Sequence, residues 1–137
     1  MADTIRKVDY FSIQTADKPG EGLRYLDALR DQDVNLLAFT GFPSGRKAQI
    51  DFIPEDTARL KAAAKKIKLA LGTKKVAFLL QGEDRAGALA DTLQKLADAK
   101  INVTALDAVT SGDGRFGAIF WVKPKDVARA GKLLGAK

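Results

Sequence analysis

The amino-acid pattern of this chain occurs twice, and this repetition constrains the fold more than any other feature. An offset of 67 positions, the distance from Gly20 to Gly87, aligns identical residues in the same order. These identities are Phe11 with Phe78, Gln14 with Gln81, Asp17 with Asp84, Leu26 with Leu93, Leu29 with Leu96, Asn35 with Asn102 and Ala38 with Ala105. Ordered identities at one offset indicate a duplicated unit. We therefore expect two tandem copies, residues 1–72 and residues 73–137.

Each copy has the residue pattern of a β-α-β-β-α unit. Runs of β-branched and aromatic residues predict strands at 8–15, 34–42, 46–53, 75–82, 101–110 and 115–122. A helix with leucines on one stripe follows each Gly-containing turn, and acidic residues or Pro124 open a second helix in each copy. The predicted fold class is α+β and ferredoxin-like, with an antiparallel sheet and helices on one face. Neither copy contains a fourth strand of its own, so that strand is either absent or shared between the copies.

The last strand of each copy is predicted at 46–53 and at 115–122. How these two strands align depends on the number of extra residues that precede the second one. Treating Asp113-Gly114 as a two-residue insertion aligns Ile50 with Ile119. On this alignment Ile119 and Trp121 face the helices, and the opposite face of the second copy becomes an uncovered apolar surface. The residues predicted to form an interface through this surface, between copies or between protomers, are Leu79, Leu106, Phe116 and Phe120.

The absence of cysteine and histidine excludes several classes of chemistry. With neither residue in the chain, disulfides, Cys/His zinc sites, thiol nucleophiles and imidazole-dependent triads are impossible. Carboxylate or lysine acid–base chemistry is not excluded, but no set of acid and base groups marks a catalytic pocket. We therefore expect no enzyme activity, no catalytic residues, no metal and no cofactor.

Charge and hydropathy favour a soluble protein of the cytoplasm. The formal charge is +6, and no apolar run approaches the roughly 18 residues of a membrane-spanning helix. The beginning of the chain has no apolar segment typical of a secretory leader. Much of the positive charge lies in residues 59–75, where an apolar stripe at helical spacing predicts a helix with a solvated lysine face. We therefore expect no membrane contact and regard nucleic-acid binding as the weaker interpretation of these lysines.

One glycine-rich motif resembles a nucleotide-binding loop but lies in the wrong context. Residues 112–117 match G-x-G-x-x-G, which binds dinucleotides where it follows a strand and opens a helix. Here the residues after the motif have the pattern of a strand, so we expect a hairpin turn.

The turn sequences and the residues that follow them resemble the ACT domain. The matching residues are Asp17-Lys18-Pro19-Gly20 with Asp33-Val34-Asn35, and Glu83-Asp84-Arg85-Ala86-Gly87-Ala88-Leu89 with Lys100-Ile101-Asn102-Val103. The resemblance covers nearly the whole chain as two tandem copies. The family usually has Gly at the positions of Asp33 and Lys100. ACT domains are small ferredoxin-like modules that bind amino acids and usually regulate amino-acid metabolism.

This resemblance implies a binding site at the loop after the first strand of each copy, typically at a subunit interface. The ligand-binding residues carried over are Asp17, Gly20 and Asn35 in the first copy, and Asp84, Gly87 and Asn102 in the second. A carboxylate suits the ammonium of an amino acid, and amide groups suit its carboxylate. In the alternative interpretation, the Asp residues cap helices and the Asn residues close turns.

The function predicted from these features is a non-catalytic regulatory protein with a free amino acid as effector. Its expected partners are a second copy in a homodimer and a regulated enzyme. One alternative is an RNA-binding module that uses the Lys-rich helix with Phe116 and Phe120. Another is a dimerisation module that binds no ligand.

Overall fold

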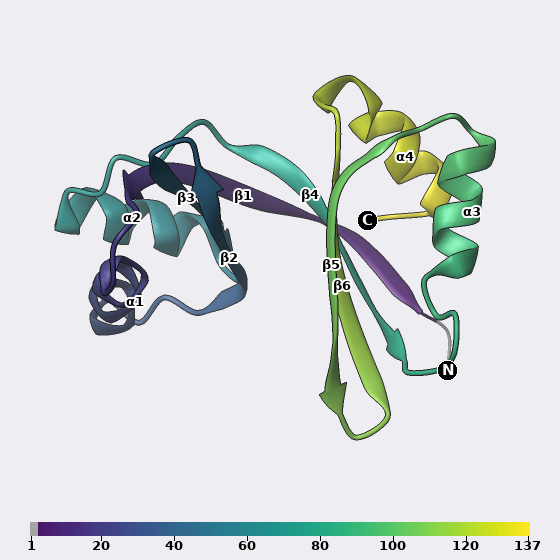
Figure 1. The fold of residues 1–137 in the computed structure, drawn as a ribbon, viewed down its shortest axis with the longest axis horizontal. Helices are drawn as coiled ribbons and strands as arrows, with labels where there is room; N and C mark the ends of the chain where they lie inside the picture. Colours follow the sequence, from purple (N-terminus) through teal and green to yellow (C-terminus); the bar gives the residue numbers. More distant parts are fainter. Residues whose placement is uncertain (1–2) are drawn as a thin grey trace. The chain divides into compact units, whose positions relative to one another are not determined.

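The computed structural model describes residues 3–137 and has the predicted α+β, ferredoxin-like architecture (Figure 1). In chain order the elements are β1 (Thr4–Ala16), α1 (Glu21–Asp31), β2 (Leu36–Ser44), β3 (Lys47–Pro54), α2 (Thr57–Ile67), β4 (Lys75–Glu83), α3 (Ala90–Asp98), β5 (Val103–Gly112), β6 (Arg115–Val122), the 3-10 turn η1 (Pro124–Asp126) and α4 (Val127–Leu134). All six predicted strands and both helices of each copy are present. Within the described residues, no helix has the length and apolar character needed to cross a membrane.

The chain forms two compact units whose boundary differs from the one expected. One is a contiguous unit of residues 9–75, and the other is a split unit that combines residues 3–8 with residues 76–137. The junction near residue 75 lies close to the expected boundary at residue 72. The first residues of the chain, however, belong with the second copy and not with the first.

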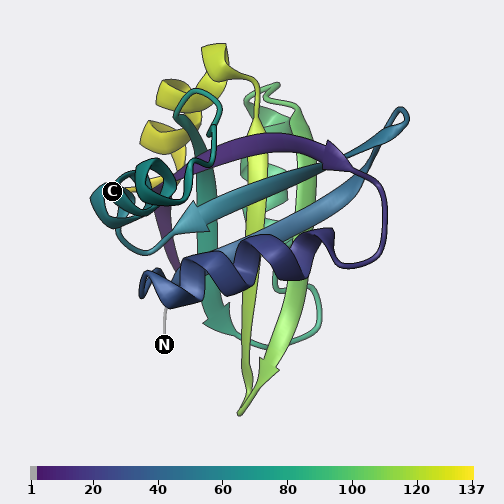
Figure 2. The same ribbon diagram turned by 90° about the vertical axis from the view of Figure 1, so that its left-hand side faces the viewer.

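The contiguous unit has its strands in the order β2-β3-β1, and α1 lies along them (Figure 2). Its core contains Phe11, Ile13, Ile50 and Phe52 from the strands, with helix residues including Leu29 and Leu60. Ile50 and Phe52 face the helices, as the alternation along this strand predicts. The segment after α2 approaches β1 closely, since the Gly72 N–H donates to the Ser12 carbonyl at 3.0 Å.

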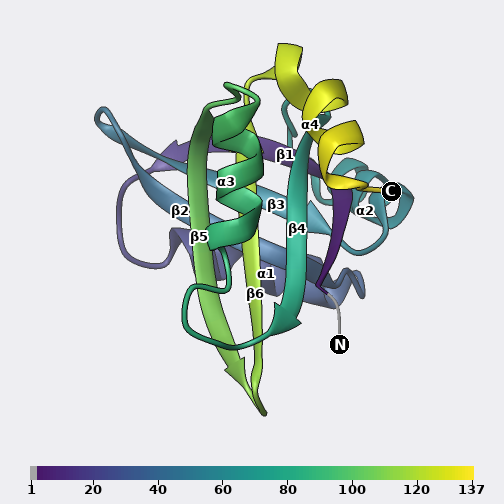
Figure 3. The same cartoon turned by 90° about the vertical axis from the view of Figure 1, so that its right-hand side faces the viewer.

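The split unit obtains its fourth strand from the beginning of the chain. Its strand order is β1-β4-β6-β5, and the first residues of β1 lie beside β4 (Figure 3). The Thr4 hydroxyl donates to the Gln81 carbonyl, and the Lys7 N–H donates to the Lys137 carbonyl at 3.0 Å. Ile5 packs against the core of this unit. This answers the question of the missing strand: in the split unit it is present and comes from β1.

Side-chain faces in the second copy are the reverse of those predicted. Phe116 and Phe120 are 6% and 0% exposed and lie in the core with Phe78 and helix residue Leu96. Leu106 packs against the same core. The predicted uncovered surface of Phe116, Phe120 and Leu106 is therefore wrong, whereas Leu79 is buried and lies outside this helix-facing core.

A β-bulge explains this error. The pairing register of β5 with β6 shifts between Thr110 and Gly112, so Ser111 is an extra residue within the strand. Phe52 pairs with Phe11, and Phe120 pairs with Phe78, which makes Phe52 and Phe120 structurally equivalent. Relative to the first copy, the second copy therefore has one extra residue before Phe120. The alignment of Ile50 with Ile119 assumed two extra residues. Because side chains alternate along a strand, an error of one residue exchanges the two faces.

Candidate functional site

The loop between β4 and α3 borders a surface hollow in the split unit. This hollow has a volume of about 320 Å³. The loop contributes Asp84 and Gly87, and β5 contributes exposed Val109 beside Ala108 and Thr110. Ala88, Leu89 and Phe116 complete the lining. Two of the predicted ligand-binding residues therefore lie at one hollow, together with β5 residues that the sequence pattern did not single out.

The carboxylates of Asp17 and Asp84 do not cap the helices that follow them. Gly20 occupies the N-cap position of α1 and Leu89 that of α3, and neither helix has a side-chain cap hydrogen bond. Both aspartates are exposed. Among residues 3–137, neither carboxylate has a hydrogen bond or an ion pair with another residue. The capping interpretation is therefore wrong, and both acceptors are available to a ligand.

Arg85 anchors the loop of the split unit to the beginning of the chain. Its two terminal nitrogens donate to the Asp3 carboxylate at 3.3 and 3.1 Å. The same guanidinium donates to the Glu83 carbonyl at 2.8 Å, on the other side of Asp84. The hydrogen bonds to Asp3 raise the pKa of Arg85, so its charge is retained. Such bidentate bonding holds the loop backbone in one geometry.

Gly87 gives this loop its turn. Its φ angle is +70°, in the left-handed region that glycine adopts at little cost. In the part of the chain that the structure describes, the backbone N–H groups of Gly87 and Leu89 have no protein acceptor. These two donors lie in the same loop as the Asp84 carboxylate.

The two predicted asparagines do not meet the aspartates within a unit. Asp17 precedes α1 and Asn35 follows it, and a helix of 11 residues is about 16 Å long. Asn102 immediately precedes β5 and lies seven positions before Val109, which lines the hollow with Asp84. Seven residues of extended chain span roughly 23 Å. The Asn35 side chain donates to the Glu55 carboxylate at 3.2 Å. A small ligand cannot bridge either Asp/Asn pair within one unit.

A hydrogen-bond network at the start of α1 was not foreseen from the sequence. The Thr15 hydroxyl donates to the Glu21 carboxylate at 2.6 Å and lies 3.0 Å from the Tyr25 hydroxyl. Arg24 donates to both oxygens of Glu21, and this bonding lowers the pKa of Glu21 to about 2. The spacing of Glu21 and Arg24, three residues apart on a helix, was the available signal.

The structure rules out a base-stacking surface made of Phe116 and Phe120. Single-stranded nucleic acid is bound by exposed aromatic faces, whereas both rings are buried under the helices. The glycine-rich motif forms the turn between β5 and β6, as predicted. Within residues 3–137, no group of three or more acidic side chains is placed to hold a metal ion.

Comparison with known families identifies the split unit. The family model of the ACT domain matches residues 76–136. These residues are an ACT domain. The match contains β4, α3 and the loop with Asp84 and Gly87, so the candidate hollow belongs to the ACT domain itself. Comparison with curated proteins gave no significant match.

Solved structures extend the similarity of fold over both units. The chain resembles a Bacteroides thetaiotaomicron protein, BT0572, with a TM-score of 0.79 and 16% identity over 96% of this chain and 88% of that one. It also resembles the regulatory subunit of aspartate kinase from Thermus thermophilus, with a TM-score of 0.64 and 14% identity, covering 98% and 95% of the two chains. Clostridium acetobutylicum aspartate kinase matches with a TM-score of 0.59 and 16% identity, over 97% of this chain and 33% of the enzyme.

Proposed function

We propose that this protein is a non-catalytic regulatory subunit that binds a free amino acid at the β4–α3 loop of its ACT domain. The observation that carries the proposal is the hollow of about 320 Å³ that contains Asp84 and Gly87. Its volume suits a small metabolite, because ligand sites begin at about 300 Å³. The similarity in fold to regulatory subunits of aspartate kinase supports a regulatory role.

The loop offers complementary groups to the two charged ends of an amino acid. Asp84 has a free carboxylate that can accept hydrogen bonds from an ammonium group. The backbone N–H groups of Gly87 and Leu89 can donate to a carboxylate. The side chains of Leu89, Val109 and Phe116 line the same hollow and leave room for a small apolar side chain.

A second copy of the chain would complete this site at the free edge of β5. Val109 on this edge strand is 72% exposed, and an exposed apolar edge favours pairing with another strand. Antiparallel pairing of two β5 strands about a two-fold axis between Ala105 and Leu106 places Asn102 of the partner subunit opposite Val109. This register would bring the partner's Asn102 to the hollow, which Asn102 cannot reach within its own unit.

The protein would act through its partner and not through chemistry of its own. Ligand binding at the paired edge would favour the dimer that forms the complete site. An enzyme that recognises this dimer would then respond to the amino-acid concentration.

The binding step can be tested by calorimetric titration of the full chain with each of the twenty amino acids. We expect at least one to bind with a dissociation constant at or below the millimolar range, and Asp84→Asn to weaken that binding at least tenfold. Asp113→Asn removes one carboxylate from an exposed turn of the same unit and should leave the affinity unchanged. No binding by any amino acid would overturn the proposed function.

The assembly step needs a separate measurement. Analytical ultracentrifugation should show a dimer that the bound amino acid stabilises. Val109→Lys should dissociate it, because the substitution places a charge on the pairing edge. Leu133→Lys, at an exposed apolar position of α4 outside this edge, is the matched control. A monomer at all concentrations, with binding intact, would exclude the shared site and leave a site within one chain.

A further inference from the structure

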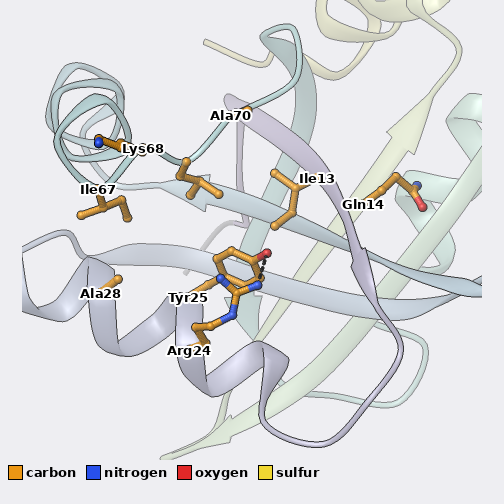
Figure 4. Close-up of a pocket in the computed structure, with 9 residues that line it drawn as sticks. Ile13, Gln14, Arg24, Tyr25, Ala28, Ile67, Lys68 and Ala70 are labelled. Atoms are coloured by element: carbon orange, nitrogen blue, oxygen red, sulfur yellow. Dashed lines mark hydrogen bonds between the residues drawn. The ribbon is translucent and has the colours of Figure 1, made fainter.

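A second cavity lies in the contiguous unit, away from the loops that follow the first strands. It has a volume of about 280 Å³ and lies between α1, the end of β1 and the segment after α2. Figure 4 shows Arg24 and Tyr25 on α1 beneath Ile13 and Gln14 of β1, with Ile67 across the space from Ile13. Ala28, Lys68, Leu69 and Ala70 complete the lining. All of these residues belong to the contiguous unit.

The walls of this cavity combine apolar side chains with polar ones, among them Gln14, Arg24 and Lys68. Ile13, Ile67 and Leu69 contribute aliphatic side chains, and Leu69 also packs against the core of the unit. The ring of Tyr25 adds an aromatic surface. Since liquid water occupies about 30 Å³ per molecule, the cavity has room for a compact organic molecule of about ten non-hydrogen atoms.

One guanidinium is held at the cavity by a preformed network. Arg24 donates through Nε and Nη2 to Glu21 at 3.1 and 3.0 Å, and through Nη2 to the Tyr25 hydroxyl at 2.8 Å. Its guanidinium carbon lies 4.3 Å from the centre of the Tyr25 ring. Among residues 3–137, the Nη1 group has no acceptor. The Arg24 side chain is 59% exposed, so its two Nη1 N–H donors are open to solvent and to a ligand. The hydrogen bonds made by its other nitrogens restrict the guanidinium, which lowers the entropy lost on binding.

The lining distinguishes between classes of ligand. A guanidinium edge binds a carboxylate well, and the aliphatic part of the wall, from Ile13, Ile67 and Leu69, suits a short hydrocarbon group. No carboxylate side chain lines the cavity, and Glu21 beside it is already bonded to Thr15 and Arg24. An ammonium group would therefore have no charged acceptor there. A carboxylic acid without an amino group fits this set better than an amino acid.

We infer that this cavity binds a small aliphatic carboxylate, with its carboxylate on Nη1 of Arg24 and its hydrocarbon group between Ile13, Ile67 and Leu69. This site differs from the proposed amino-acid site in position, in charge pattern and in ligand class. It would let the chain respond to an organic acid independently of the amino acid.

The test uses 4-methylpentanoate as the probe, with calorimetry and amide chemical shifts of the full chain. We expect binding with a dissociation constant at or below the millimolar range, and shifts at residues 13, 28 and 69. The neutral isostere 4-methylpentanamide and the variant Arg24→Gln should each bind at least tenfold more weakly. Ala28→Leu, which fills the cavity and keeps the charge, should also weaken binding tenfold.

Arg30→Gln is the matched control. Arg30 lies on the same helix and makes an equivalent ion pair three residues away, with Asp27. Its removal should leave the affinity unchanged. Absence of binding at 10 mM, equal binding of acid and amide, or unchanged affinity in folded Arg24→Gln would each overturn the inference. Leucine is the amino-acid counterpart of this probe, so the proposed amino-acid site is the competing place of binding. Amide shifts confined to the β4–α3 loop would assign binding to that site and overturn the inference.

Discussion

At the scale of single residues, Asp33 and Lys100 are two of the four non-glycine residues within 3–137 that have a left-handed backbone. Asp33 and Lys100 both have a φ angle of +58°, directly after the first helix of each copy. The ACT family usually has Gly at these positions, and the structure supplies the physical reason, since a left-handed residue with a Cβ costs about 1 kcal/mol or more. The sequence indicated a turn there, but the sign of φ follows from the geometry of the complete turn.

Replacing Lys100 by glycine should therefore stabilise the protein. Lys100→Gly relieves the left-handed strain, and we expect the free energy of unfolding to rise by about 1 kcal/mol. Urea denaturation gives the value. Lys95→Gly, inside helix α3, is the control and should lower stability by about 1 kcal/mol. Destabilisation by both substitutions would contradict the strain assigned to Lys100.

The network around Glu21 predicts a dependence of stability on pH. Hydrogen bonds from Arg24 lower the pKa of Glu21 from 4.5 to about 2 in the folded chain. The stabilisation is therefore fully present above pH 4.5 and is lost as the pH falls towards 2. Glu21→Gln should reduce the loss of stability between pH 5 and pH 2, as measured by denaturation at each pH. Parallel curves for the parent and the variant would show that Glu21 does not titrate differently on folding.

At the scale of the elements, the sequence predicted the strands and helices well but misassigned the faces of β5 and β6. Alternation and turn residues were sufficient to place β3 and β6, because both are regular strands that begin after short turns. The bulge at Ser111 leaves no comparable signal, because Ser and Gly there are equally typical of the turn itself. For the candidate site, the loops were found from their residues. The contribution of Val109 and the separation of Asn102 from Asp84 depend on tertiary structure and could not be predicted.

The corrected faces can be tested in the core of the split unit. Phe120→Ala should lower the free energy of unfolding by about 3–5 kcal/mol, because it removes a fully buried ring. Val109→Ala, at an exposed edge position, should change it by less than about 0.5 kcal/mol. Chemical denaturation of both variants distinguishes them, and similar small effects would restore the original assignment of faces.

The close approach of Gly72 to β1 gives a further test. A Cβ atom at position 72 would lie 2.9 Å from the carbonyl oxygen of Ser12. Backbone atoms on both sides must shift to relieve this contact, so Gly72→Ala should destabilise the protein by about 1–3 kcal/mol. Gly41→Ala, where a Cβ has ordinary contact distances, should be nearly neutral. Equal unfolding midpoints for the two variants would show that the segment after α2 is free to move.

At the scale of the whole molecule, the two units are not built in the same way. The contiguous unit is formed by residues 9–75, whereas the split unit needs residues from both ends of the chain. The sequence indicated this ambiguity, because neither copy contained its own fourth strand. The charged residues Arg6 and Lys7 hid the beginning of β1, since their pattern is not that of a buried strand.

Removal of residues 1–8 should therefore affect mainly the split unit. Without these residues β4 loses its neighbour, and Arg85 loses the carboxylate of Asp3. We expect hydrogen exchange to accelerate in β4 and β6, while the amides of β3 retain their protection. The untruncated chain measured under the same conditions is the reference. Equal acceleration in β3 would mean that the two units unfold together.

Because the split unit includes the beginning of β1, the order of synthesis determines the order in which the two units can fold on the ribosome. Residues 9–75 are contiguous and can fold as soon as they emerge, whereas residues 4–8 must wait for residues 76–137. At typical elongation rates, this interval lasts roughly 3 to 12 s. During that time the beginning of β1 lacks the strand of its own unit with which it pairs in the complete fold. An unpaired strand segment can pair with the wrong partner, so completion of the split unit ends the period in which residues 4–8 are exposed to such pairing.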